Sequence, residues 1–208
     1  MKKTTCAMAA AAAVLLAAGS AGAQICNGFP IADNQASLGA LAKFPSGVNE
    51  FGVEGAFNFN GPLSANAGYI RAEETGGGDS SLDIFRIGAA LDVSGYTGGF
   101  LPGVSVCPTV RADFASQGGV DSYLVPVGIG LGVSVPLGSP TMSLSPYVIP
   151  AAYFSHSSDG VNSSSSTDFG IRGGADLSVD RFYFGGTIEW LNVSGSDAVF
   201  GVRAGIKF

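Results

Sequence analysis

Apolar and polar positions alternate with a period of two residues over most of the chain from residue 50 onward. Phe51 and Val53 are apolar, whereas the neighbouring Glu50 and Glu54 are charged. The same alternation recurs in later segments, most regularly over residues 123–137, where glycines separate the apolar positions. No helix start follows these glycines, so a strand is favoured over a phosphate-binding loop. Strict alternation predicts β-strands with one apolar face and one small or polar face.

This pattern divides the chain into ten predicted strands. Most have the ~9–11 residues that a tilted strand needs to cross the hydrocarbon layer of a membrane. We therefore expect an all-β fold, a single closed antiparallel up-and-down transmembrane β-barrel of ten strands, with eight strands as the alternative. The ten strands are expected at residues 36–44, 49–59, 62–74, 82–94, 103–115, 121–137, 141–156, 167–179, 181–193 and 198–208.

The lengths of the connections agree with this topology. Bacterial barrels have short periplasmic turns and longer extracellular loops. Connections at residues 74–80 and 156–167, expected outside the cell, are long, polar and rich in Gly or Ser. The connection over residues 94–102 is an exception, because it is longer than a periplasmic turn should be. The tight turns expected on the periplasmic side lie at residues 60–62, 138–140 and 179–181.

Composition points to a membrane environment. Charged residues make up only 12% of the chain and the mean hydropathy is +0.35, whereas a soluble surface is richer in charge. No apolar run outside the N-terminal segment has the ~20 residues of a spanning helix. A barrel explains both observations, since half of each strand faces lipid. The competing fold, a soluble secreted β-barrel, would expose a poorly solvated surface of Gly, Ser and Ala.

Aromatic residues gather near the ends of the predicted strands. Interfacial girdles of a membrane barrel have this distribution, because amphipathic and aromatic rings favour the headgroup level. The residues concerned are Phe44, Phe59, Phe114, Tyr123, Phe154, Phe169, Phe182, Trp190, Phe200 and Phe208.

The N-terminal segment has the features of a secretory signal peptide. Lys2 and Lys3 precede an alanine-rich apolar run, and the small residues at 21–23 form an A-x-A-type cleavage site before Gln24. We expect a signal peptide over residues 1–23, a periplasmic N-terminal segment over 24–35 and an outer-membrane barrel domain over 36–208.

Cysteine usage agrees with export. Cys6 leaves with the signal peptide, so the mature chain retains Cys26 and Cys107. An oxidising periplasm favours a disulfide between them. Metal ligation and redox catalysis are disfavoured because CxxC spacing and further ligands are missing, and no cofactor or metal is expected.

The charge balance bears on possible partners. Removal of Lys2 and Lys3 lowers the ten basic residues to eight against sixteen acidic ones, a formal charge of −8. No cluster of Lys or Arg remains, which argues against nucleic acid as a partner.

The last predicted strand ends on an aromatic residue, Phe208, after alternating apolar positions. It is similar to the C-terminal signal of bacterial outer-membrane barrels, although Arg203 stands where those proteins often have glycine. With the signal peptide, it makes the chain resemble the small opacity-type outer-membrane barrels. This resemblance implies an outer-membrane location with both termini periplasmic and recognition by the barrel-assembly machinery during biogenesis. It further implies a monomer whose partners are outer-membrane lipid and lipopolysaccharide.

The inward parity carries most of the charge of the predicted barrel. Six acidic and five basic side chains face inward, and interdigitated opposite charges would satisfy one another. Because a ten-stranded barrel encloses little free space, these charges predict a largely plugged interior. The narrow-pore alternative stays open, since inward glycines such as Gly174, Gly185, Gly201 and Gly205 leave room. The inward charges are Glu50, Glu54, Arg86, Asp92, Arg111, Asp113, Arg172, Asp176, Glu189, Arg203 and Lys207.

One enzymatic alternative rests on the single histidine. His156 and Ser158 share the outward parity of Phe154, and this resembles the lipid A deacylase barrels, which carry a His-x-Ser pair on the outer wall and an acid on the next strand. Asp168 is the nearest acid, but it has inward parity, and the serines belong to a Ser-rich stretch. We therefore expect a non-enzymatic barrel with a structural or surface-interaction role, and keep the passive narrow pore and the deacylase as alternatives.

Overall fold

The computed structural model describes residues 28–32, 35–59, 62–76, 81–94, 104–139, 141–192 and 197–208, and the backbone of β1 (Ala23–Gln24). The predicted signal peptide, apart from the backbone of Ala23, lies outside the described residues, as do Cys26 and most of the predicted connection at residues 94–102. The described part contains no helix long and apolar enough to cross a membrane.

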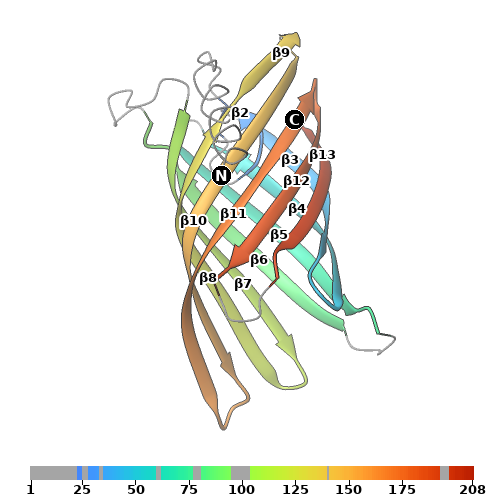
Figure 1. Ribbon diagram of the computed structural model, residues 1–208, viewed down its shortest axis with the longest axis vertical. Helices are drawn as coiled ribbons and strands as arrows, with labels where there is room; N and C mark the ends of the chain where they lie inside the picture. Colours follow the sequence, from blue (N-terminus) through green and yellow to red (C-terminus); the bar gives the residue numbers. More distant parts are fainter. Residues whose placement is uncertain are drawn as a thin grey trace, which may run out of the picture.

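Ten antiparallel strands close into a barrel (Figure 1). Closure is made by the last strand, which pairs with the first from Phe200 opposite Phe44 to Lys207 opposite Ser37. The prediction of a closed ten-stranded barrel is confirmed. In barrel order the strands are β3 (Ala36–Phe44), β4 (Val48–Asn58), β5 (Leu63–Glu74), β6 (Ser81–Leu91), β7 (Val104–Gln117), β8 (Val120–Val133), β10 (Met142–Ser158), β11 (Ser163–Val179), β12 (Phe182–Leu191) and β13 (Val199–Lys207).

The additional strand β9 (Val135–Ser139) is a continuation of β8 after an interruption at Ser134. Its residue Val135 lies opposite Leu144 of β10, in the same register that places Gly132 opposite Tyr147. The predicted strand over residues 121–137 is therefore present but broken. At the break the alternation fails, because Val133 is buried although its parity is that of the outward residues.

The predicted loop from His156 to Thr167 is wrong. β10 and β11 continue their ladder to Ser158 opposite Ser163, so only residues 159–162 form the turn. The Asp159 carboxylate accepts the backbone N–H groups of Asn162 and Val161 at 2.6 and 2.9 Å. These donors hold the pKa of Asp159 below its ordinary value. Ser and Thr are compatible with an extended strand, and polarity alone did not distinguish a strand that extends beyond the membrane from a loop.

Large apolar side chains cover the outer wall of the barrel. Phe51, Val53 and Ile87 are each about half exposed, at 48%, 53% and 56%. All ten aromatic residues of the predicted girdles are exposed as well. An apolar outer wall around a polar interior is the reverse of a soluble protein, and it fits a barrel in lipid.

The inner wall pairs large side chains with glycines of the adjacent strands. Tyr183 is fully buried, and a Cβ atom at Gly205 would approach its ring to 2.6 Å. A Cβ atom at Gly174 would similarly lie 2.8 Å from the hydroxyl of Tyr147. In the narrow-pore alternative, the space beside inward glycines would be open. Beside Gly205 and Gly174 it is filled by the side chains of Tyr183 and Tyr147.

The two ends of the barrel differ. We call the end at which Phe208 pairs with Ala36 the proximal end and the opposite end the distal end. The β7–β8 and β10–β11 hairpins project at the distal end (Figure 1). Near the proximal end, residues 28–32 lie within the barrel and include β2 (Ile31–Ala32), whose buried Ile31 packs with Phe29 and Ala56.

Replacement of Gly205 by alanine should destabilise the barrel by about 1–3 kcal/mol, because the new methyl group would overlap the buried ring of Tyr183. The matched control is Gly186→Ala, where a Cβ atom meets nothing closer than a backbone oxygen at 4.0 Å. Denaturant unfolding in detergent micelles measures both. Equal stability of the two variants would contradict the close packing of Tyr183 on Gly205.

Candidate functional site

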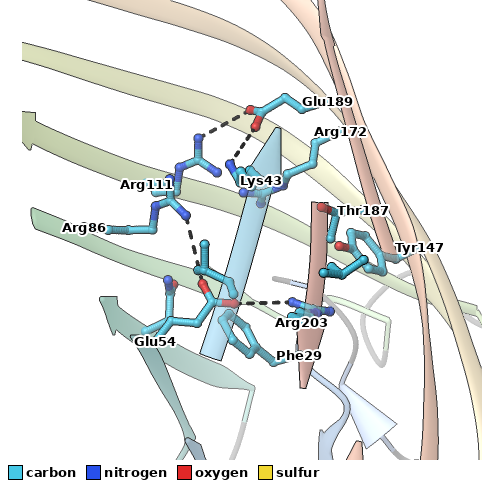
Figure 2. A pocket seen from close by; sticks show the side chains of 13 residues that line it. Phe29, Lys43, Glu54, Arg86, Arg111, Tyr147, Arg172, Thr187, Glu189 and Arg203 are labelled. Atoms are coloured by element: carbon cyan, nitrogen blue, oxygen red, sulfur yellow. Dashed lines mark hydrogen bonds and ion pairs between the residues drawn. The ribbon is translucent and has the colours of Figure 1, made fainter. Parts of the chain in front are cut away.

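Nine charged side chains from seven strands meet inside the barrel between its two ends, and Figure 2 shows most of them. We call this set the charge layer. Its members are Lys43, Glu54, Arg86, Arg111, Asp113, Arg172, Asp176, Glu189 and Arg203.

Arg203 and Asp176 form the most deeply buried pair. The Arg203 Nε donates to Asp176 Oδ1 at 2.8 Å, and its Nη2 donates to Oδ2, so the contact is bidentate. The Arg203 Nη1 also lies 3.8 Å from Glu54. The rings of Phe29 and Tyr147 lie 5.2 and 5.6 Å from the guanidinium carbon, within cation–π range. This pair therefore joins the β-strands to the N-terminal segment.

A second cluster centres on Asp113. Arg86 binds it through two hydrogen bonds of 2.7 and 2.9 Å, and Arg111 approaches it to 3.2 Å. Arg86 also lies 4.0 Å from Glu54, so Glu54 connects this cluster to Arg203. Bidentate Arg–carboxylate geometry gives the strongest pairs of this kind.

Glu189 is the third centre. It binds Lys43 at 3.2 Å and Arg111 at 3.4 Å, and it accepts a hydrogen bond of 2.9 Å from the hydroxyl of Tyr153. Arg111 contacts both Asp113 and Glu189 and thereby connects β7 to β12, which are not adjacent in the barrel.

Glycines stand between the partners of two of these pairs. Gly185 is opposite both Asp176 and Arg203 in the ladders, and Gly68 is opposite both Glu54 and Arg86. A Cβ atom at Gly185 would collide with the Asp176 carboxylate. Because the intervening strand carries no side chain there, charges two strands apart can reach each other.

The charge layer differs from the predicted set of inward charges at four positions. Lys43 was missed, because the alternation of its strand is blurred. Its position opposite Glu50 in the β3–β4 ladder could have indicated its inward face. Glu50 lies towards the distal mouth, Asp92 binds Ser94 near the proximal end, and Lys207 stands next to the C-terminal residue. The charge layer therefore holds four carboxylates and five cations instead of six and five.

Two spaces adjoin the charge layer. A vestibule of about 530 Å³ reaches the distal hairpins and is lined by residues that include His156 and Ser165. A smaller cavity of about 40 Å³ is lined by Phe29, Tyr147 and Arg172 among others. The side chains of Lys43, Arg86, Arg111 and Glu189 line both spaces and thus lie between them.

Cys107 is fully buried and packs against Ala90. Its predicted disulfide partner, Cys26, lies outside the described residues, so this pairing stays a prediction. Among the described residues, no group of three or more His, Cys, Asp or Glu side chains could hold a metal ion.

The three residues of the deacylase alternative do not contact one another. His156 stacks on Tyr123 and its Nδ1 lies 2.9 Å from the hydroxyl of Ser165, a residue of the adjacent strand. The Ser158 hydroxyl accepts the N–H group of Gly160. Asp168 accepts a hydrogen bond from Ser166. Among the described residues, the serine hydroxyl that shares a hydrogen bond with His156 is therefore that of Ser165 and not that of Ser158.

No protein-family model matches the chain, and no curated protein matches it either. Solved structures of bacterial outer-membrane β-barrels are similar. The β domain of the Bordetella autotransporter BrkA is 11% identical with a TM-score of 0.51, and the match covers 84% of this chain and 97% of that one. The N-terminal β-barrel domain of Pseudomonas aeruginosa OprF is 11% identical with a TM-score of 0.40, covering 85% and 98%. Ail of Yersinia pestis is 14% identical with a TM-score of 0.28, covering 84% and 95%. At these identities the similarity concerns the fold alone.

Replacement of Asp176 by asparagine should cost about 3 kcal/mol of stability, because it leaves the buried Arg203 with only the more distant Glu54. Asp83→Asn is the control, since Asp83 is exposed and accepts a single hydrogen bond from Tyr69. It should change stability by no more than about 0.5 kcal/mol. Denaturant unfolding measures both, and a similar small effect at Asp176 would argue against an energetically coupled charge layer.

Proposed function

We propose that this chain is an integral protein of the bacterial outer membrane with a structural or surface-interaction role and a largely plugged interior. The charge layer is the observation that carries the proposal. Its ion pairs join strands on different sides of the barrel, and the cavity beside it has a volume of only about 40 Å³. Such a volume holds about three water molecules, too few for a hydrated solute to pass.

The N-terminal segment supports a closed interior. Phe29 is 4% exposed and stacks on Arg203, and Ile31 is 1% exposed. Both residues occupy the part of the barrel between the charge layer and the proximal end. A disulfide between Cys26 and Cys107 would fix this segment in place, since Cys107 lies on the inner wall.

We assign the distal end to the cell surface. The even number of strands puts both ends of the barrel domain at the proximal end, which is the periplasmic side in bacterial barrels. The projecting β7–β8 and β10–β11 hairpins would then face the exterior and carry any surface interaction. The outward, apolar face of each strand would contact outer-membrane lipid and lipopolysaccharide.

The closed interior is tested by conductance in planar lipid bilayers. The mature wild-type protein should give no steady single-channel current. A variant that lacks residues 24–34 and also carries Arg111→Ala and Glu189→Ala should give discrete current steps, because both the N-terminal segment and the ion pair across the lumen are then removed. Val161→Ala is the control, since Val161 is 90% exposed in the distal turn. Steady current from the wild type would replace the plugged barrel by the narrow pore.

The absence of acyl-hydrolase activity is a further expectation. Lipid A incubated with the detergent-folded protein should keep all its acyl chains, as should lipid A incubated with the His156→Ala variant. Mass spectrometry of lipid A measures this. Loss of an acyl chain with the wild type alone would make His156 catalytic, with Ser158 or Ser165 as the candidate nucleophile.

A further inference from the structure

Arg172 is the one cation of the charge layer without an ion pair within 4 Å or a hydrogen bond in the described part of the chain. Arg172 stands opposite Glu189 in the β11–β12 ladder, but Glu189 is already bound by Lys43 and Arg111. The other three carboxylates of the layer are likewise paired with cations other than Arg172. Arg172 instead lines the 40 Å³ cavity, and Figure 2 shows it extending from β11 towards Lys43.

Arg111 supplies a second donor without an acceptor. The residue is 7% exposed and lines the same cavity, and its Nε is buried with no hydrogen-bond partner, although its Nη2 binds Asp113 and Glu189. The lining also includes Lys43 and the hydroxyl-bearing Thr187. Several hydrogen-bond donors therefore line this small cavity. Its lining also includes the carboxylates of Glu54 and Glu189 and apolar side chains such as Phe29 and Leu41.

Charge balance points to what is missing. A guanidinium cannot neutralise itself by losing a proton, and a charge removed even partly from water without a close partner is costly. Arg172 is half-buried. Within the layer five cations face four carboxylates. Glu50 is a neighbour of Lys43 in the ladder, but it lines the vestibule and not the cavity. One negative charge inside the cavity would complete the layer.

We propose that the cavity binds one small monovalent anion of the size of chloride, held by the guanidinium groups of Arg172 and Arg111. The volume of about 40 Å³ admits such an ion and excludes a large organic anion. The inference rests on the plugged interior proposed above, because an interior open to bulk water would screen Arg172 without a bound ion.

Thermal unfolding of the mature protein in detergent tests this site. The midpoint should be higher in sodium chloride than in sodium gluconate at equal ionic strength, and it should rise with the logarithm of the chloride concentration. Arg172→Met should abolish the difference between the two salts. Arg71→Met, at an exposed arginine paired with Glu73, should retain it. A difference that persists in Arg172→Met, or is absent from the wild type, would overturn the proposal.

Bromide provides a measurement that needs no variant. Crystals of the wild-type protein grown in sodium bromide should show an anomalous peak between Arg172 and Arg111, and a cavity without that peak would contradict the anion site. The conductance measurement is independent of both tests. A conducting wild type would refute the plug and with it the anion site, whereas a closed wild type without chloride-specific stabilisation would refute the anion site alone.

Discussion

Every backbone N–H and C=O group within a membrane must find its partner inside the protein, because hydrocarbon offers none. The pairing of β13 with β3 meets this constraint by removing both edges of the sheet. Closure also divides each strand into an outward and an inward face. Apolar residues cover most of the outer wall, and the nine charges of the charge layer face a narrow lumen. The interior ion pairs are thus a consequence of closure.

The charge layer shows how a narrow lumen accommodates these charges. Arg203 and Asp176 stand two strands apart, and the glycine between them leaves the space in which they meet. Glycines near Tyr183 and Tyr147 make room for aromatic rings in the same way. Inward glycines in this barrel therefore allow side chains from the strands on either side of them to pack against each other.

In a closed lumen, a charge without an ion pair is not screened by bulk water. Four carboxylates and four of the five cations form ion pairs with one another, whereas Arg172 has no carboxylate within 4 Å among the described residues. An anion from the solvent could therefore bind at Arg172. A bound anion would make the charge layer electrically complete without another carboxylate. The charge layer would then both hold the strands together and bind an ion, and neither role involves catalysis.

The sequence alone predicted ten strands, with eight as the alternative, and the inward and outward faces of most of them, because a period of two is a local property of each segment. It did not predict that β10 and β11 extend to Ser158 and Ser163. It placed Arg86, Asp113 and Arg203 inside without showing how they pair. Those contacts, such as Arg111 with Glu189 across non-adjacent strands, depend on the stagger of the closed ladder, which no single segment contains. The alternation along the strand of Lys43 is blurred, so the sequence did not place Lys43 inside. It placed Glu50 inside, but not at the level of the vestibule. Only the tertiary structure decided which charges meet, and that Arg172 has no carboxylate within 4 Å among the described residues.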